Sequence, residues 1–220
     1  YIDKNEIINL KKDLGLKKTD FIVLYVGRIA KEKSIDFLIN NFNSVLKQIP
    51  KAKMIIVGDG PDIKDLIDLT RKKGLENKII FTGKAPWTDV PKYYSLCDLF
   101  VTASKTETQG LTVMEAMGAS KPVVAIRDES FELMITDKKD GLFFDDEKSY
   151  VDMIYEVYKN KKLRDEISFN ARLTADKYSP CNYAKNVLKV YDKVISKDTN
   201  VVKKVVHNVK NIFTKSGGKK

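Results

Sequence analysis

Two carboxylates with seven residues between them are the most informative feature of the sequence. Glu107 and Glu115 flank Gly110, in a segment that leads from an apolar run into a stretch with helical periodicity. If a helix begins near Gly110, its free backbone N–H groups and its positive dipole end attract a diphosphate, which glycine lets approach closely. Glu115 can then accept hydrogen bonds from ribose hydroxyl groups, and Glu107 can accept those of a sugar.

A second group of charged residues follows an earlier apolar run. Arg28 and Lys33 lie in the segment that begins at Gly27, with Lys31 as a weaker alternative to Lys33. A guanidinium fork and an ammonium group at this spacing can clamp a diphosphate and neutralise the charge that builds up on a leaving group. Cations and carboxylates together predict a pocket for a sugar diphosphate.

The elements that must position these residues follow from hydrophobic patterning. Short apolar runs rich in β-branched residues alternate with stretches of helical periodicity, which predicts a doubly wound, Rossmann-like α/β fold with a parallel sheet. Such sheets bind ligands at the carboxyl ends of their strands, where both charged segments fall. Strands are expected at 21–26, 54–57, 78–82, 99–101, 122–125 and 142–144. Helices are expected at 35–49, after Pro61, at 90–96, 111–119 and 129–136, and from 148 to 196 with breaks near Asn160 and Pro180.

The positive charge of the chain predicts a second, smaller region. The formal net charge is +10, and residues 197–220 hold seven lysines and one aspartate among valines at helical spacing. We therefore expect a domain over 1–196 followed by a basic amphipathic tail over 197–220, which suits an anionic membrane surface. Two alternatives for the tail are packing on another domain and a frayed end. The start of the chain does not resemble a signal peptide, so we expect a cytoplasmic protein, peripheral on the inner face of the cell membrane.

These motifs resemble the retaining glycosyltransferases of the GT-B fold, of the family-4 type. The family's Glu-x7-Glu pair, its Glu-Ala-Met segment and its Pro-Val-Val strand match Glu107, residues 115–117 and residues 122–124. The resemblance runs from about 21 to 196 and implies the carboxyl-terminal, donor-binding domain, with a helical extension after it. It also implies that an amino-terminal, acceptor-binding domain lies outside this sequence. Ser120 departs from the family, which often has glycine there.

The resemblance implies a role for each candidate residue. Arg28 and Lys33 hold the donor pyrophosphate, Glu107 contacts the sugar and Glu115 the ribose. Backbone groups of Lys84 and Ala85 are expected at the base. Independently of the resemblance, Trp87 is expected to be a packing residue, with a base-stacking platform as the alternative. The expected catalytic residues are Glu107, Arg28 and Lys33, and the expected donor-binding residues are Gly27, Arg28, Lys33, Lys84, Ala85, Glu107, Gln109, Gly110, Leu111, Thr112 and Glu115.

The implied reaction is transfer of a hexose, with glucose from UDP-glucose as first choice, with retention of configuration. The segment 106–112 looks like that of bacterial diacylglycerol glucosyltransferases, which favours a membrane lipid as acceptor. No metal cofactor is expected, because the fold class usually works without one and no Asp-x-Asp motif lies near the donor residues. The chain alone is expected to bind a UDP-sugar weakly and to catalyse nothing.

Other interpretations stay open at this point. Within the class, the acceptor can instead be a capsule or cell-wall polysaccharide. A different class is a noncatalytic nucleotide- or nucleic-acid-binding module that uses the basic tail, although no aromatic residues interleave with its lysines, so no nucleic-acid partner is expected. A glycosidase acid/base pair is disfavoured, because basic residues close by suit a diphosphate better.

Overall fold

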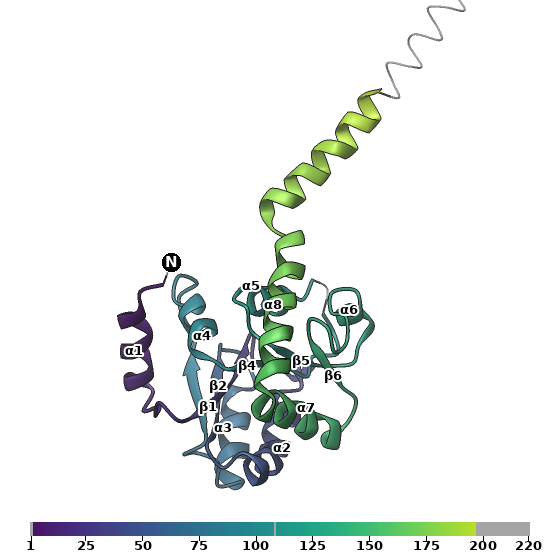
Figure 1. Ribbon diagram of the computed structural model, residues 1–220. Helices are drawn as coiled ribbons and strands as arrows, with labels where there is room; N and C mark the ends of the chain where they lie inside the picture. The colour runs from purple at the N-terminus through teal and green to yellow at the C-terminus, as the bar shows by residue number, and fades with distance from the viewer. Residues whose placement is uncertain (1, 108, 197–220) are drawn as a thin grey trace, which may run out of the picture. The chain divides into compact units, whose positions relative to one another are not determined.

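A six-stranded parallel sheet lies at the centre of the unit formed by residues 1–175 (Figure 1). The computed structural model describes residues 2–107 and 109–196. The strand order is β3-β2-β1-β4-β5-β6, and every neighbouring pair is parallel. The predicted doubly wound, Rossmann-like sheet is therefore confirmed. The strands are β1 (Phe21–Val26), β2 (Ala52–Val57), β3 (Ile79–Gly83), β4 (Leu99–Thr102), β5 (Val123–Ile126) and β6 (Leu142–Phe144).

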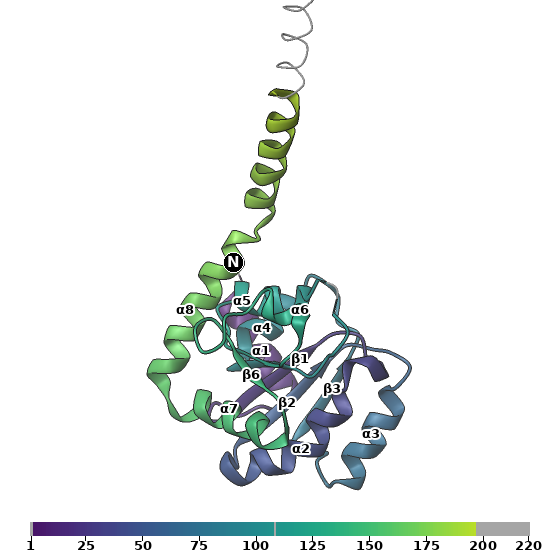
Figure 2. The same ribbon diagram turned by 90° about the vertical axis from the view of Figure 1, so that its right-hand side faces the viewer.

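Helices cover both faces of this sheet. Figure 2 shows α2 and α3 on one side of β1 to β3 and α1 and α4 on the other. Helix α2 contacts α3 and α7, while α4 contacts β1 and α5 contacts β5. The helices are α1 (Lys4–Asp13), α2 (Ile35–Gln48), α3 (Ile63–Lys72), α4 (Val90–Leu96), α5 (Leu111–Gly118), α6 (Glu129–Glu132), α7 (Glu147–Lys159) and α8 (Lys161–Lys177), with a 3-10 turn, η1, over Lys31–Lys33.

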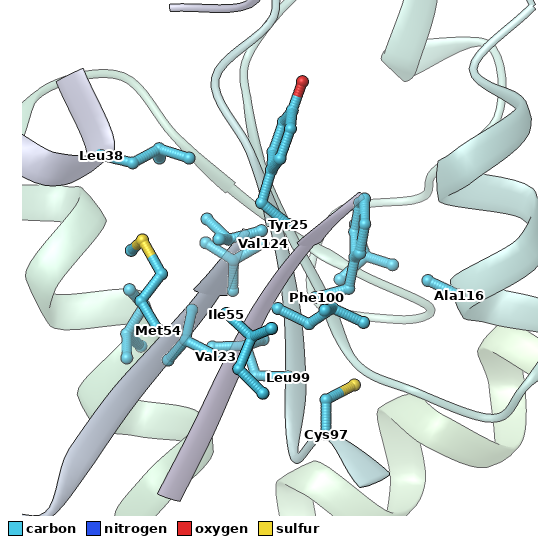
Figure 3. Close-up of a cluster of buried hydrophobic side chains, with 14 of the residues drawn as sticks. Val23, Tyr25, Leu38, Met54, Ile55, Cys97, Leu99, Phe100, Ala116 and Val124 are labelled. Atoms are coloured by element: carbon cyan, nitrogen blue, oxygen red, sulfur yellow. The ribbon is translucent and has the colours of Figure 1, made fainter. Parts of the chain in front are cut away.

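Strand β1 lies at the centre of the core, and all six of its residues are buried. Helices on both faces remove every side chain of this strand from water, which is why its sequence is a continuous apolar run. Figure 3 shows Val23, Ile55 and Leu99 packed together, with the Tyr25 hydroxyl pointing away from the aliphatic cluster. The central strands therefore form a rigid base for the loops that follow them.

Two helices differ from expectation. Helix α1 was not expected, although Asp3 caps it by accepting a hydrogen bond from the backbone N–H of Asn5 at 2.9 Å. Helix α6 ends at Glu132 and not at residue 136. The backbone N–H of Thr136 donates instead to the buried Asp140 carboxylate at 2.6 Å, and this side-chain acceptor turns the chain out of the helix.

Ser120, the departure from the family pattern, lies in the short connection between α5 and β5. Its φ angle is 57°, in the left-handed region that favours glycine. The serine therefore carries a conformational cost, yet the connection from α5 to β5 still forms.

The carboxyl-terminal residues form a separate compact unit. Contacts divide the chain into residues 1–175 and 176–220. Within the first unit, α8 is held by the buried side chains of Ile167 and Ala171. In the second unit, residues 180–196 are helical, as expected. The predicted tail, 197–220, lies outside the described residues, so its amphipathic helix and the boundary at 196 stay predictions. Among the helices of the described residues, none has the length and apolar character to cross a bilayer.

Candidate functional site

The two charged segments meet where the sheet changes its winding direction. Strands β1 and β4 are neighbours, although β2 and β3 lie between them in sequence, so the loops after both strands open at the same edge. A cavity of about 270 Å³ lies between these loops. It is lined by Tyr25, Val26, Gly27, Arg28, Lys33, Thr102, Glu107, Gln109, Gly110, Leu111 and Thr112.

The closest contact in this cavity joins a cation from one loop to a carboxylate from the other. The Nζ atom of Lys33 lies 2.6 Å from Oε1 of Glu107 and 3.4 Å from Oγ of Ser104. The side chains of Lys33 and Glu107 are only 18% and 19% exposed, so water screens this pair weakly. The structure thus brings together two of the three expected catalytic residues. Lys31, the weaker alternative, is exposed and does not line this cavity.

Arg28, the third of these residues, keeps its guanidinium group accessible. Its side chain is 67% exposed, with Nη1 at 3.8 Å from Oε1 of Glu32, and it lines the same cavity. The carbonyl oxygen of Arg28 accepts a hydrogen bond from the hydroxyl of Tyr25 at 3.1 Å. Burial raises the pKa of Tyr25, and the charges of Glu107 and Glu32 add to this, so the phenol stays a donor at neutral pH.

The turn after β2 supports the Arg28 loop through the main chain. The backbone N–H of Ile29 donates to the carbonyl of Asp59 at 2.9 Å. A Cβ at Gly58 would collide with the carbonyl oxygen of Gly27, and one at Gly60 with that of Ile29. These glycines are therefore required for the close approach of the two main-chain segments.

Helix α5 begins at the same cavity. The helix begins next to Gly110, as the sequence predicts, and Gly110 is its N-cap with a left-handed φ of 52°. The N–H of Val113 donates to the Gly110 carbonyl at 2.9 Å, while Leu111 and Thr112, at the first two positions of the helix, line the cavity. The first N–H groups of a helix are suited to binding an anion. Leu111 and Gln109 are exposed beside them, and Thr112 is half-buried. This end of α5 is suited to a diphosphate.

Glu115 lies one turn further along α5 and has a different kind of partner. Its Oε2 atom accepts a hydrogen bond from the Tyr94 hydroxyl at 2.8 Å, and the same hydroxyl lies 3.2 Å from the carbonyl of Thr112. Burial raises the pKa of Tyr94, and the charge of Glu115 adds to this, so the phenol is protonated. A buried neutral donor thus orients an exposed carboxylate.

Glu115 lines a cavity of about 670 Å³ whose other walls are mostly apolar, including Val90 and Pro91. Trp87 also lines it and is 86% exposed, so the expectation that Trp87 is a packing residue is wrong. Trp87 lies in the loop after β3, where its side chain is accessible to a ligand.

Lys84 and Ala85 line a third cavity, of about 500 Å³, together with Gly27 and Arg28. Val26 lines all three cavities, so they adjoin at the end of β1. The expected donor-binding residues therefore line three adjoining cavities, together called the crevice, with Glu115 in one of them and Lys84 in another.

Sequence reasoning missed Tyr25, Tyr94 and Ser104. All three are buried. The available signal for the two tyrosines was a phenol within an otherwise apolar strand and another on a buried helix face, because a buried phenol needs a hydrogen-bond partner.

Known proteins are similar to this chain in sequence and in fold. The chain is 35% identical to an alpha-monoglucosyldiacylglycerol synthase of Acholeplasma laidlawii over 195 residues, covering 89% of this chain and 49% of the relative. It thus spans about half the length of this relative. A solved structure of HepE from Anabaena, in complex with UDP and glucose, matches with a TM-score of 0.72 and 25% identity, over 80% of this chain and 48% of the other.

A third match concerns a domain of about this size. The C-terminal domain of a glycosyl transferase group 1 family protein, LpcC from Francisella tularensis, matches with a TM-score of 0.70 and 25% identity. The match covers 82% of this chain and 96% of that domain. The expected GT-B domain type is confirmed. The family model described as "Glycosyl transferases group 1" matches residues 6–174. On this match, the chain belongs to the group 1 glycosyltransferase family.

Proposed function

We propose that this chain is the donor-binding half of a retaining glycosyltransferase that transfers a hexose, glucose from UDP-glucose, to a membrane lipid such as diacylglycerol. One observation carries the proposal. Arg28, Lys33 and Glu107 come from two separate strand ends and line one cavity at the start of α5. Cations and helix N–H groups suit a diphosphate, and a neighbouring carboxylate suits the hydroxyl groups of a sugar joined to it.

Each group has a defined task in the proposed reaction. Arg28, Lys33 and the first N–H groups of α5 neutralise the charge that develops on the departing diphosphate. Glu107 accepts hydrogen bonds from hydroxyl groups of the hexose. Glu115, oriented by Tyr94, accepts hydrogen bonds from those of the ribose. The backbone near Lys84 meets the base. These charges are supplied by side chains and main chain, so the proposed transfer proceeds without a metal ion.

The lipid acceptor is supported by the similarity to a protein named as a glucosyldiacylglycerol synthase. The chain spans about half of that relative, so we propose that the acceptor binds between this domain and a second one. Closure of the two domains would exclude water from the sugar, which favours transfer over hydrolysis. We further propose that the protein is bacterial and acts in the cytoplasm, peripheral on the inner face of the membrane.

Calorimetric titration of the 220-residue chain with UDP and UDP-glucose tests the donor site. We expect both ligands to bind, each with the same affinity in the presence and in the absence of EDTA. We expect Glu115→Ala to abolish binding of UDP. The matched control is Glu76→Ala, an exposed carboxylate between α3 and β3 at the opposite edge of the sheet. Loss of binding in EDTA would disprove metal-independent binding of the donor. Normal UDP binding by Glu115→Ala would disprove the assignment of Glu115 to the ribose.

Co-sedimentation with vesicles tests the membrane proposal separately. We expect the chain to bind phosphatidylglycerol vesicles and not phosphatidylcholine vesicles. A chain that ends at Ser196 should lose this binding, because seven lysines lie beyond that residue. Equal binding by both chains would exclude the tail as the membrane contact.

A further inference from the structure

The ion pair between Lys33 and Glu107 limits what Lys33 can offer to an anion. Nζ and Oε1 are 2.6 Å apart, and less than a fifth of either side chain is exposed. A short, charge-assisted hydrogen bond in such a setting is among the stronger polar contacts in proteins. The pair carries no net charge, so a diphosphate that arrives at Lys33 also meets the Glu107 carboxylate.

The second cation of the cavity is held differently. Arg28 is 67% exposed, and its contact with the exposed Glu32 is longer, at 3.8 Å. A surface pair of this kind contributes little and is readily given up. A diphosphate can therefore recruit Arg28 freely, whereas recruiting Lys33 weakens the bond that neutralises Glu107.

Two ligands of the proposed donor site differ in what they give back to Glu107. A nucleotide sugar brings hydroxyl groups that donate to the carboxylate when Lys33 turns to the phosphate. A nucleoside diphosphate without sugar brings no such donor, so it leaves an unsatisfied anion close to its own negative charge. An unpaired charge that is largely removed from water is costly.

We infer that Glu107, through its bond to Lys33, makes the site discriminate against the sugar-free nucleoside diphosphate and in favour of the intact donor. This inference rests on the proposed function. It gives Glu107 a role in expelling the spent nucleotide, in addition to its contact with the sugar.

The test compares UDP and UDP-glucose binding to the 220-residue chain and to Glu107→Gln. The amide keeps the shape of the carboxylate but removes its charge, so Lys33 becomes fully available. We expect the dissociation constant of UDP to fall about tenfold and that of UDP-glucose to rise or stay unchanged. The ratio of the two constants is the readout, because general damage to the fold would weaken both ligands.

Glu32→Gln is the matched control. It removes the same charge from the same cavity region, at an exposed position, and should change UDP affinity less than about twofold. Glu107→Ala should tighten UDP as Glu107→Gln does, which separates the loss of charge from any contact made by the amide.

The outcomes separate this inference from the proposed function. If the parent chain binds both ligands and Glu107→Gln leaves UDP affinity unchanged or weaker, the inference is wrong and the donor site stands. An equal gain of UDP affinity in Glu32→Gln also overturns it, because the effect would then come from the overall electrostatic potential and not from the bond between Glu107 and Lys33. If the parent chain binds neither ligand, the proposed function fails and this inference fails with it.

Discussion

The two proposed donor carboxylates are held in opposite ways. On the phosphate side of the crevice, the cavity lined by Arg28, Lys33 and Glu107, the carboxylate is partly buried and bonded to a cation. On the ribose side, the cavity lined by Tyr94 and Glu115, it is exposed and bonded to a buried neutral phenol. The first arrangement cancels charge, whereas the second fixes direction and leaves the charge in place.

The two sides should therefore bind their parts of the donor through different interactions. An ion pair competes with any charged ligand, so binding on the phosphate side depends on exchange between charges. The Tyr94 phenol is neutral and leaves Glu115 able to accept hydrogen bonds from a ligand. Binding on the ribose side therefore depends on the orientation of Glu115 and on the apolar walls of the cavity. Ligands that contain only one half of the nucleotide can therefore separate the two sides.

Among the changes that distinguish the two sides, Lys33→Ala gives the largest expected effect. The change removes a cation from the proposed diphosphate site and leaves the negative charge of Glu107 there without its cation, so UDP-glucose affinity should fall about 100-fold. Uridine, which carries no phosphate, should bind as before. Calorimetry measures both, with Lys31→Ala as the control because Lys31 is an exposed lysine of the same loop. An equal loss for uridine would break the division into two sides.

Tyr94→Phe is the corresponding change on the ribose side. It removes the donor that orients Glu115, so affinities for UDP and uridine should both fall about tenfold. Tyr93→Phe changes the neighbouring residue of α4 and leaves this hydrogen bond in place. If UDP alone weakened, Glu115 would belong to the phosphate side.

Tyr25→Phe sharpens the comparison, because its hydroxyl serves the phosphate side without carrying a charge. The loss of its hydrogen bond to the Arg28 carbonyl should weaken UDP-glucose about fourfold. Uridine affinity measured by calorimetry should not change. An unchanged UDP-glucose affinity would mean that the neighbouring turn alone holds Arg28 in place.

Salt should produce the smallest difference. Raising sodium chloride from about 50 mM to about 300 mM shortens the screening length and should weaken UDP about twofold. Uridine should be unaffected, since it carries no charge of its own. A similar response of both ligands would show that charge reaches the ribose side as well.

Local patterns were sufficient for most of the fold. The bounds of β1 and α4 match expectation, since an unbroken apolar run marks a strand covered on both faces and Pro91 lies in the first turn of a helix. Helix α1 escaped notice because none of its residues is buried, so it has little apolar periodicity. Only Asp3, with Glu6 three residues later, marked its beginning.

The site was predictable as a meeting place but not as a set of bonds. The rule that ligands bind at strand ends placed Arg28, Lys33 and Glu107 together. Lys33 and Glu107, however, are 74 positions apart, and each was assigned to a ligand and not to the other. Contacts of this kind depend on the tertiary packing of loops, which local spacing does not encode. The same holds for Tyr94 and Glu115.

The main-chain contact of Gly58 and Gly60 with the Arg28 loop has a consequence for engineering. Neither glycine can take a side chain without moving the carbonyl of Gly27 or Ile29. A designer who wishes to graft a new donor preference by exchanging residues 27–33 must therefore transplant residues 58–61 in the same step. The two segments form a single exchangeable module, although a whole helix and strand separate them along the chain.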